Sequence, residues 1–316
     1  MTPGSADEHT AVLVEEALAA LAVQPAGYYL DATFGRGGHS ARILAALGPA
    51  GRLLALDRDP DAIAAGRARF AGDARLVLVQ GEFADLEALW RAQFAARDCD
   101  GLLFDLGVSS PQLDQPGRGF SFQHDGPLDM RMDPTQGASA ADWLNRARQD
   151  EIRDVIATLG EERFAGRVAS AIVAARQQRP LARTAELAAV IARAVRTREP
   201  GKHPATRSFQ AIRMHVNDEL GQIARALEQA LRVLAAGGRL VVISFHSLED
   251  RLVKNFLRAH ATVDPVLAGL PVIPESARPP LRLVGRKQRA GSAELAANPR
   301  ARSAVLRVAE KPAVRA

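Results

Sequence analysis

The chain has 316 residues, of which 47% are hydrophobic and 24% charged, a composition typical of one large globular domain or two smaller ones. A net charge of +5 is compatible with a nucleic-acid partner. Apolar runs are too short for a membrane span, the N-terminus lacks a signal-peptide pattern, and a single cysteine excludes an internal disulfide. We therefore expect a cytoplasmic protein without a membrane contact.

Strands and helices alternate through the first third of the chain. Helical patterns cover residues 10–21, 60–70 and 86–95, between apolar strand candidates at 28–31, 52–57, 75–80 and 101–106. Strands that alternate with helices favour a parallel, doubly wound sheet. The sequence therefore predicts an α/β protein with a Rossmann-like sheet.

A helical region then interrupts this pattern. Helices are predicted at 150–159, 161–178 and 184–197, with a capping box from Ser139 to Asp142. Apolar residues recur at spacings of three and four from Phe209 to Leu234, a stripe that Gly237 and Gly238 would stop. We interpret residues 115–215 as an inserted helical domain, and residues 1–114 and 216–316 as the α/β domain.

The sheet resumes after the insertion. Strands are predicted at 239–245 and 303–309, with a helix at 248–259 between them. Ser247 and Asp250 have the spacing of a capping box at the start of that helix. Residues 261–292 carry no clear pattern.

A glycine-rich turn, Asp31–Ser40, follows the first strand and opens a helix. Its glycines do not have the Gly-x-Gly-x-x-Gly spacing of a dinucleotide site, and an acid at Asp31 would repel pyrophosphate. The same acid suits a ligand with ammonium and sulfonium charges, such as S-adenosylmethionine. Asp57 ends the next strand, where it could accept from ribose hydroxyls or cap the following helix. Phe83 follows the third strand, where it could stack on adenine or belong to the core.

The loop after the fourth strand, Asp105–Gln112, lies at the predicted ligand crevice. Methylation of an exocyclic amine requires hydrogen-bond acceptors around the nitrogen, whose lone pair is conjugated into the ring. Ser109, Ser110 and the carbonyls before Pro111 offer such acceptors on a loop stiffened by proline. A tight turn with no catalytic role is the structural alternative.

Three basic side chains precede the apolar stripe, and one histidine follows the fifth strand. Lys202, His203 and Arg207 could contact phosphate, or they could be solvated surface. His246 would lie at the rim of the crevice, where it could contact the substrate. No clustered metal-ligand pattern appears, and no metal is expected.

Several long motifs, in a fixed order along the chain, resemble those of one known protein family. The chain resembles the bacterial 16S ribosomal RNA cytosine N(4)-methyltransferases, the MraW/RsmH family, from His9 to about Glu310. The matching segments are Asp31–Ser40, Asp57–Pro60, Asp105–Asp114, Arg118–Phe122, Gly126–Asp133, Lys202–Gln210, Ser244–Arg251 and Asn298–Ser303. The resemblance implies a class I methyltransferase domain with an inserted helical domain that recognises the substrate. It implies that the cofactor contacts fall on Gly37, Gly38, His39, Asp57, Phe83, Asp105 and Gln112.

We therefore hypothesise transfer of the methyl group of S-adenosylmethionine to the N(4) amine of a cytidine in the decoding region of 16S ribosomal RNA, within the small ribosomal subunit. Three alternatives stay open at this point: an amino-methyltransferase acting on DNA or protein, a nicotinamide-dependent oxidoreductase, which the glycine spacing disfavours, and a non-catalytic RNA-binding protein. The sequence leaves the oligomeric state open, a homodimer included.

Overall fold

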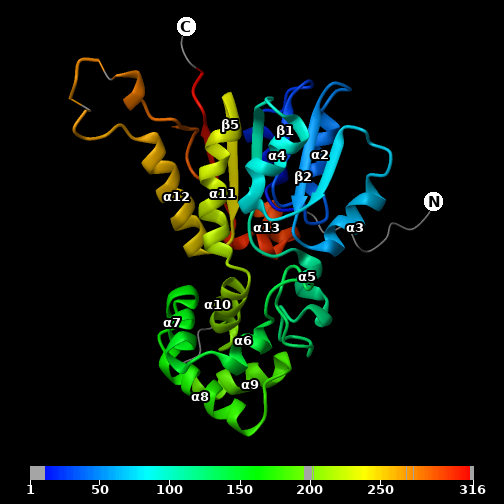
Figure 1. Cartoon of the computed structure of the whole chain (residues 1–316), viewed down its shortest axis with the longest axis vertical. Helices are drawn as coiled ribbons and strands as arrows, with labels where there is room; N and C mark the ends of the chain where they lie inside the picture. The colour runs from blue at the N-terminus through cyan, green and yellow to red at the C-terminus, as the bar shows by residue number, and fades with distance from the viewer. Residues whose placement is uncertain (1–10, 196–200, 202, 268, 273, 314–316) are drawn as a thin grey trace. The chain divides into compact units, whose positions relative to one another are not determined.

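The computed structural model describes residues 11–195, 201, 203–267, 269–272 and 274–313. The chain divides into two compact units, one formed by Met1–Gly107 with Leu220–Ala316 and the other by Val108–Glu219. We name them the sheet unit and the helical unit; Figure 1 draws the helical unit in green. The boundaries predicted from the sequence, 115 and 215, lie a few residues inside the helical unit.

The sheet unit contains a seven-stranded sheet with the strand order β3-β2-β1-β4-β5-β7-β6. The first five strands of this order are parallel, β7 is antiparallel to β5, and β6 is antiparallel to β7. The predicted α/β class with a Rossmann-like sheet is therefore confirmed. The strands are β1 (Tyr28–Asp31), β2 (Arg52–Asp57), β3 (Leu76–Gln80), β4 (Cys99–Asp105), β5 (Leu234–Ser244), β6 (Arg282–Leu283) and β7 (Val305–Glu310).

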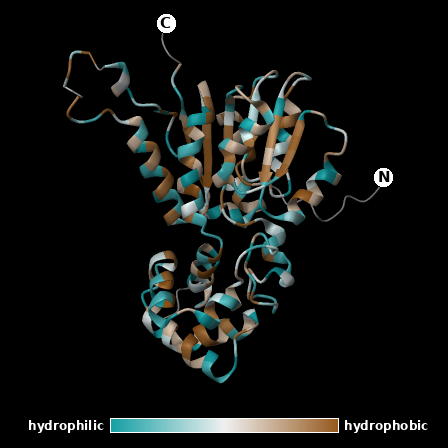
Figure 2. Cartoon of the chain, viewed as in Figure 1, coloured by the Kyte–Doolittle hydropathy of each residue, from teal (hydrophilic) through white to brown (hydrophobic). Residues whose placement is uncertain are grey.

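Helices cover both faces of this sheet. Alternate strand residues point to opposite faces, so Leu30 packs in one core with α4, α11 and α12, while Tyr29 packs in another with α1 and α2. Because both faces are covered, the central strands are apolar throughout, as their colour in Figure 2 shows. The helices are α1 (Val14–Leu21), α2 (Gly38–Ala46), α3 (Pro60–Arg69), α4 (Leu86–Phe94), α11 (Glu219–Val233), α12 (Ser247–Ala261) and α13 (Ser292–Ala297).

The helical unit has its own hydrophobic core, to which Ile152, Val168, Ile191 and Ile212 contribute fully buried side chains. Its capping box is confirmed, because the Ser139 hydroxyl accepts from the Asp142 amide at 3.1 Å. A long segment without regular helix, between Gly119 and Ser139, precedes this cap. The helices are α5 (Ser110–Asp114), α6 (Ala140–Arg146), α7 (Gln149–Gly160), α8 (Ala165–Gln178), α9 (Thr184–Ala194) and α10 (Thr206–Val216).

The apolar stripe from Phe209 to Leu234 does not lie on one continuous helix. The chain leaves the helical conformation at Asn217 and Asp218, where Asp218 has φ 47°, and α11 then starts a new helix. Phe209 lies in the core of the helical unit, whereas Leu227 lies in the core of the sheet unit. The same spacing therefore continues across a break because each half buries its apolar face in a different core.

The glycines expected to stop this stripe lie within a strand instead. β5 begins at Leu234, five residues before the predicted start, and it includes Gly237 and Gly238. The Gly237 amide donates to the Lys311 carbonyl at 2.7 Å, which extends the pairing to the segment after β7. The unassigned stretch 261–292 contributes β6, which pairs with β7.

Cys99 is fully buried at the start of β4. Its thiol donates to the carbonyl of Gly101 at 3.0 Å. Burial, as the largest cause, raises the pKa of this thiol far above its ordinary value. Cys99 is therefore a structural side chain of the sheet.

Among the described residues, no helix combines the length and the apolar character needed to cross a bilayer.

Candidate functional site

Three acidic side chains end three adjacent strands of the sheet unit. Asp57 ends β2, Asp31 ends β1 and Asp105 ends β4, in the sheet order β2-β1-β4. Parallel strands place their carboxyl ends at one edge, which is where ligands bind in open α/β sheets. The sequence-predicted residues Asp57 and Asp105 therefore lie at the same edge, with Asp31 between their strands.

Asp57 organises the glycine-rich turn. One carboxylate oxygen accepts from the Gly35 amide at 2.7 Å, and the other accepts from the Asp59 amide at 2.8 Å. Burial, as the largest cause, raises the pKa of Asp57 to about 6, although both hydrogen bonds lower it. Each carboxylate oxygen can accept a second hydrogen bond, so Asp57 can still accept hydrogen bonds from the two hydroxyl groups of a ribose.

Two glycines of this turn lie where neighbouring side chains leave no room for a Cβ. Gly37 has φ 73°, and a Cβ there would lie 2.7 Å from the ring of Phe34. A Cβ on Gly38 would lie 2.7 Å from the methyl group of Ala11. Residues with side chains at these two positions would therefore push the turn away from its neighbours.

Asp31 is a buried anchor for the start of α2. Its carboxylate accepts from the Ser40 hydroxyl at 2.7 Å and from the Thr33 amide at 3.2 Å. Burial raises the pKa of Asp31, whereas the nearby His39 and the two hydrogen bonds lower it. Ser40 and Thr33 were not singled out from the sequence; small hydroxyl residues on either side of the glycines were the available signal.

Asp105 faces His39 across the same edge. The Asp105 Oδ2 atom lies 3.6 Å from His39 Nδ1, and the Asp105 amide donates to the Thr33 hydroxyl oxygen at 2.6 Å. The second carboxylate oxygen, Oδ1, is buried and has no hydrogen-bond partner within the described residues. Burial raises the pKa of Asp105 to about 6, and the charge of His39 is the largest opposing cause. An unpartnered buried acceptor at a ligand edge fits a cationic ligand group.

Phe83 packs against the core of the sheet unit with part of its side chain accessible. It begins a short 3-10 turn after β3, and its ring meets that of Phe104 edge to face with centroids 5.8 Å apart. The side chain is only partly buried against the core. One part of the ring is therefore fixed by packing while another part stays accessible.

The predicted amine-binding loop belongs to the helical unit. Ser109 stands at the N-cap of α5, followed by Ser110 and Pro111 in its first turn. Gln112 is buried, and its side-chain oxygen accepts from the Ser109 amide at 3.0 Å. Within its own unit, Gln112 thus braces the turn that carries both hydroxyl groups.

The predicted basic contacts also belong to the helical unit. His203 is exposed, and its ring lies 4.7 Å from the ring of Phe122. Arg207 donates from its guanidinium to the Glu161 carbonyl at 2.5 Å. Lys202 lies outside the described residues.

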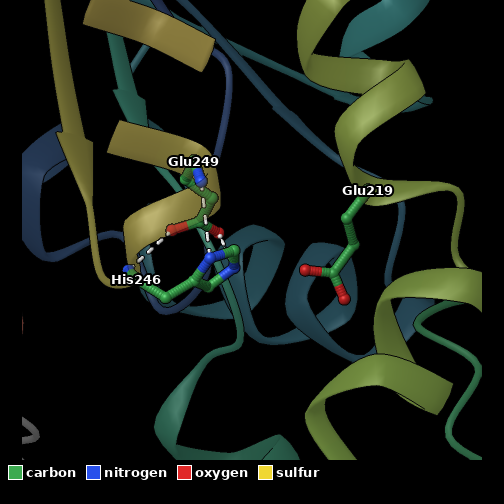
Figure 3. A group of neighbouring side chains, drawn as sticks. All are labelled: Glu219, His246 and Glu249. Atoms are coloured by element: carbon green, nitrogen blue, oxygen red, sulfur yellow. Dashed lines mark hydrogen bonds and ion pairs between the residues drawn. The ribbon is translucent and has the colours of Figure 1, made fainter. Parts of the chain in front are cut away.

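His246 begins α12 together with Glu249, as Figure 3 shows. His246 Nδ1 accepts from the Glu249 amide at 3.4 Å, and Nε2 lies 3.0 Å from Glu249 Oε1. The Glu249 carboxylate also accepts from the Phe245 amide at 2.8 Å. The third side chain drawn, Glu219, belongs to the helical unit, where it pairs with Arg213 at 2.7 Å.

This cap corrects the one expected from the sequence. Ser247 and Asp250 were expected to form the capping box, but His246 and Glu249 form it instead. Asp250 pairs with Arg307 of β7 through two hydrogen bonds of 2.7 and 3.1 Å. The cap thus begins one residue earlier because Asp250 is held by the neighbouring strand.

Comparison with known proteins decides the family. A family model described as the MraW methylase family matches residues 6–312. The chain belongs to the MraW methylase family. It is 60% identical to "Ribosomal RNA small subunit methyltransferase H" of Thioalkalivibrio sulfidiphilus over 98% of this chain and 99% of that protein. A relative of the same name from Thiobacillus denitrificans is 60% identical over 96% of this chain and 97% of that protein.

Membership of the MraW methylase family confirms the resemblance inferred from the motifs and makes the chain a methyltransferase. The expected cofactor is confirmed as well, because S-adenosylmethionine is the methyl donor of this family. Its ammonium and sulfonium groups match the acidic edge formed by Asp31, Asp57 and Asp105. The individual contacts assigned to the site residues stay predictions.

Proposed function

We propose that this MraW-family methylase transfers the sulfonium methyl group of S-adenosylmethionine to the exocyclic N(4) amine of a cytidine in the decoding region of 16S ribosomal RNA. The observation that carries the proposal is the 60% identity, over 98% of the chain, to a protein named for methylation of small-subunit ribosomal RNA. The cytosine amine and the decoding region rest on the motif resemblance described above.

The acidic edge of the sheet unit supports the donor half of this proposal. Asp57 would accept from the ribose hydroxyls with the lone pairs that Gly35 and Asp59 leave available. Phe83 would contact adenine, and the unpartnered Oδ1 of Asp105 would accept from the ammonium group. Gly37, Gly38, His39 and Gln112 complete the proposed cofactor contacts, the last of them from the helical unit.

The loop of the helical unit supports the acceptor half. The conjugated amine lone pair must turn out of the ring plane to attack the methyl carbon, so acceptors on the amine hydrogens favour the reactive geometry. Ser109 and Ser110 would supply these acceptors, and Pro111 would limit the freedom of the turn. The rate would come mainly from holding the amine in line with the methyl–sulfur bond. The methylated nitrogen would lose its proton afterwards.

The helical unit is the proposed substrate-recognition domain. Lys202, His203 and Arg207 would contact the RNA backbone from this unit, and His246 would contact substrate from the sheet unit. The target base must be unstacked for its amine to reach the donor. The partner proposed is 16S ribosomal RNA within the small ribosomal subunit.

Nucleoside mapping tests the proposal. Small-subunit RNA from a strain lacking this protein should lack one N(4)-methylated cytidine, and the purified chain should restore it on isolated subunits. Methyl incorporation that survives ribonuclease but not deoxyribonuclease or protease would instead favour a DNA or protein substrate. Donor binding without any incorporation would favour a non-catalytic RNA-binding protein.

A further inference from the structure

The outward face of α12 carries positive charges and no acid. Its exposed polar residues from the second turn onward recur at helical spacings of three and four, so they share one face. They are Arg251, Lys254, Asn255 and Arg258. The opposite face holds α12 on the sheet through the buried side chains of Val253 and Leu257. The basic face of α12 is therefore turned away from the core of the sheet unit.

A second group of cations lies on the segment that follows β6. This segment runs along β7, where the Val284 amide donates to the Val308 carbonyl at 3.0 Å. The Gln288 amide donates to the Leu306 carbonyl at 2.9 Å. Gly285, with φ 67°, turns the chain between these two points. The exposed basic side chains of the segment are Arg286, Lys287 and Arg289.

Asp250, in the first turn of α12, shows that the two groups of cations are neighbours. Arg307 of β7 donates to both of its carboxylate oxygens, at 2.7 and 3.1 Å. Burial raises the pKa of Asp250, but Arg307, Lys287 and Lys254 together lower it below its ordinary value. One carboxylate thus feels a lysine of α12 and a lysine of the segment after β6. Because Arg307 already pairs with this carboxylate, the two lysines add an excess of positive charge.

We name the six cations of the two groups the basic edge: Arg251, Lys254, Arg258, Arg286, Lys287 and Arg289. Five of them form no ion pair with any described residue: Lys254, Arg258, Arg286, Lys287 and Arg289. Arginines elsewhere on the sheet unit do have acidic partners, as Arg42 has in Glu15 and Arg232 in Glu87, each at 2.6 Å. Like charges three and four residues apart disfavour a helix, so the α12 face does not serve folding. A bound polyanion would neutralise this repulsion.

We propose that the basic edge binds the phosphate backbone of ribosomal RNA beside the base that is methylated. α12 begins after His246, the proposed substrate contact of the sheet unit, and Arg251 lies about one helical turn further along. The basic edge therefore continues from the proposed site within the same unit. The inference rests on the proposed function, which supplies RNA as the partner. It adds a contact surface from a part of the chain, after residue 261, whose sequence carries no clear pattern.

The test is the salt dependence of binding. Contacts to phosphates release counterions, so each one steepens the fall of the logarithm of affinity with the logarithm of salt concentration. The full chain would be bound to isolated small ribosomal subunits in filter assays as salt is raised from about 50 to 300 mM. Lys254→Gln combined with Lys287→Gln should reduce the magnitude of this slope by about 1.5 to 2. The affinity should fall about tenfold or more at about 0.1 M salt.

The two lysines are chosen because neither has a structural role of the kind open to Arg258. Arg258 lies in the last turn of α12, where a positive charge also stabilises the helix dipole. Lys254→Arg combined with Lys287→Arg keeps both charges and should bind as the wild type does. The matched control is Arg42→Gln combined with Arg67→Gln, which removes two exposed charges from α2 and α3 of the same unit. Its slope should equal that of the wild type, and calorimetry should find unchanged donor affinity in all three variants.

Four outcomes would overturn the inference alone: an unchanged slope in the glutamine variant, an equal loss in the control, an equal loss in the arginine variant, or a loss seen with subunits but not with protein-free 16S ribosomal RNA. The second would make the effect one of net charge, the third one of structure, and the fourth a contact with ribosomal protein. A wild-type chain that binds neither subunits nor their RNA would overturn the proposed function together with the inference.

Discussion

Replacing Asp57 by alanine should weaken donor binding through two separable effects. The substitution removes the acceptor for the Gly35 and Asp59 amides, at 2.7 and 2.8 Å, and it removes the proposed acceptor for the ribose diol. A hydrogen bond to a charged group contributes about 1.5–3 kcal/mol. Loss of the diol contact alone should therefore reduce affinity about ten- to a hundredfold.

A double-variant cycle distinguishes the diol from the turn. Calorimetry would compare wild type and Asp57→Ala, each with S-adenosylmethionine and with an analogue that lacks both ribose hydroxyls. If Asp57 binds the diol, Asp57→Ala should weaken the natural donor more than it weakens the analogue, and this difference, the coupling free energy, should be about 1.5–3 kcal/mol. Asp73→Ala is the matched control, because its carboxylate pairs with Arg75 at 2.7 Å outside the acidic edge.

The opposite outcome has an equally definite meaning. If Asp57→Ala weakens the analogue as much as the natural donor, the coupling is zero and Asp57 acts only by holding the Gly35 turn. The placement of Asp57 against ribose would then be wrong, although the site as a whole would stand.

Three further predictions concern Asp105 in the sheet unit and two turns of the helical unit. Asp105→Asn should raise the melting temperature of the ligand-free protein by a few degrees at pH 7.5 and leave it unchanged near pH 3.5. Folding raises the pKa of Asp105 from 3.8 to about 6, so the stability that this carboxyl group contributes is full below pH 3.8 and is lost as the pH rises through 6. An equal melting temperature for the variant and the wild type at pH 7.5 would contradict this. Ser109→Ala combined with Ser110→Ala should slow single-turnover methylation of small subunits at saturating donor while sparing donor affinity; a wild-type rate would make the hydroxyls structural. Gly119→Ala should destabilise the helical unit by about 2 kcal/mol or more in denaturant unfolding, because Gly119 has φ 73° and its Cβ would lie 2.3 Å from the Pro127 carbonyl oxygen. Gly137→Ala is the control and should cost about 1 kcal/mol, because Gly137 has a similar φ of 69° but faces open space. Equal losses in the two variants would contradict the clash at Gly119.

The bounds of β1 and β2 could be predicted to the residue, and those of β4 to within two residues. A strand buried on both faces reads as an unbroken apolar run, and in β2 and β4 an acid marks the last residue. The alternation of strands and helices then predicted that these strands are parallel, so that their carboxyl ends lie at one edge of the sheet. The acidic edge could therefore be expected before the structure, with Asp57 and Asp105 on it.

Local spacing could not show which partner takes each side chain. His246 with Glu249 and Ser247 with Asp250 have the same three-residue separation, and only the Arg307 contact from β7 removes Asp250 from the cap. In the same way, the stripe that ends at Leu234 continues in phase across Asn217 and Asp218, so periodicity did not reveal two cores. Both errors arise where a long-range contact overrides a local pattern.

The burial of the chain's single cysteine has a practical consequence for measuring motion. Cys99 is fully buried and its thiol is held in the protonated, unreactive form. Thiol-reactive dyes should therefore not label the natural protein. One new surface cysteine in each unit would accept a fluorophore pair without any compensating substitution. Energy transfer between the two dyes would then report directly, in the otherwise native enzyme, whether donor or RNA changes the separation of the units.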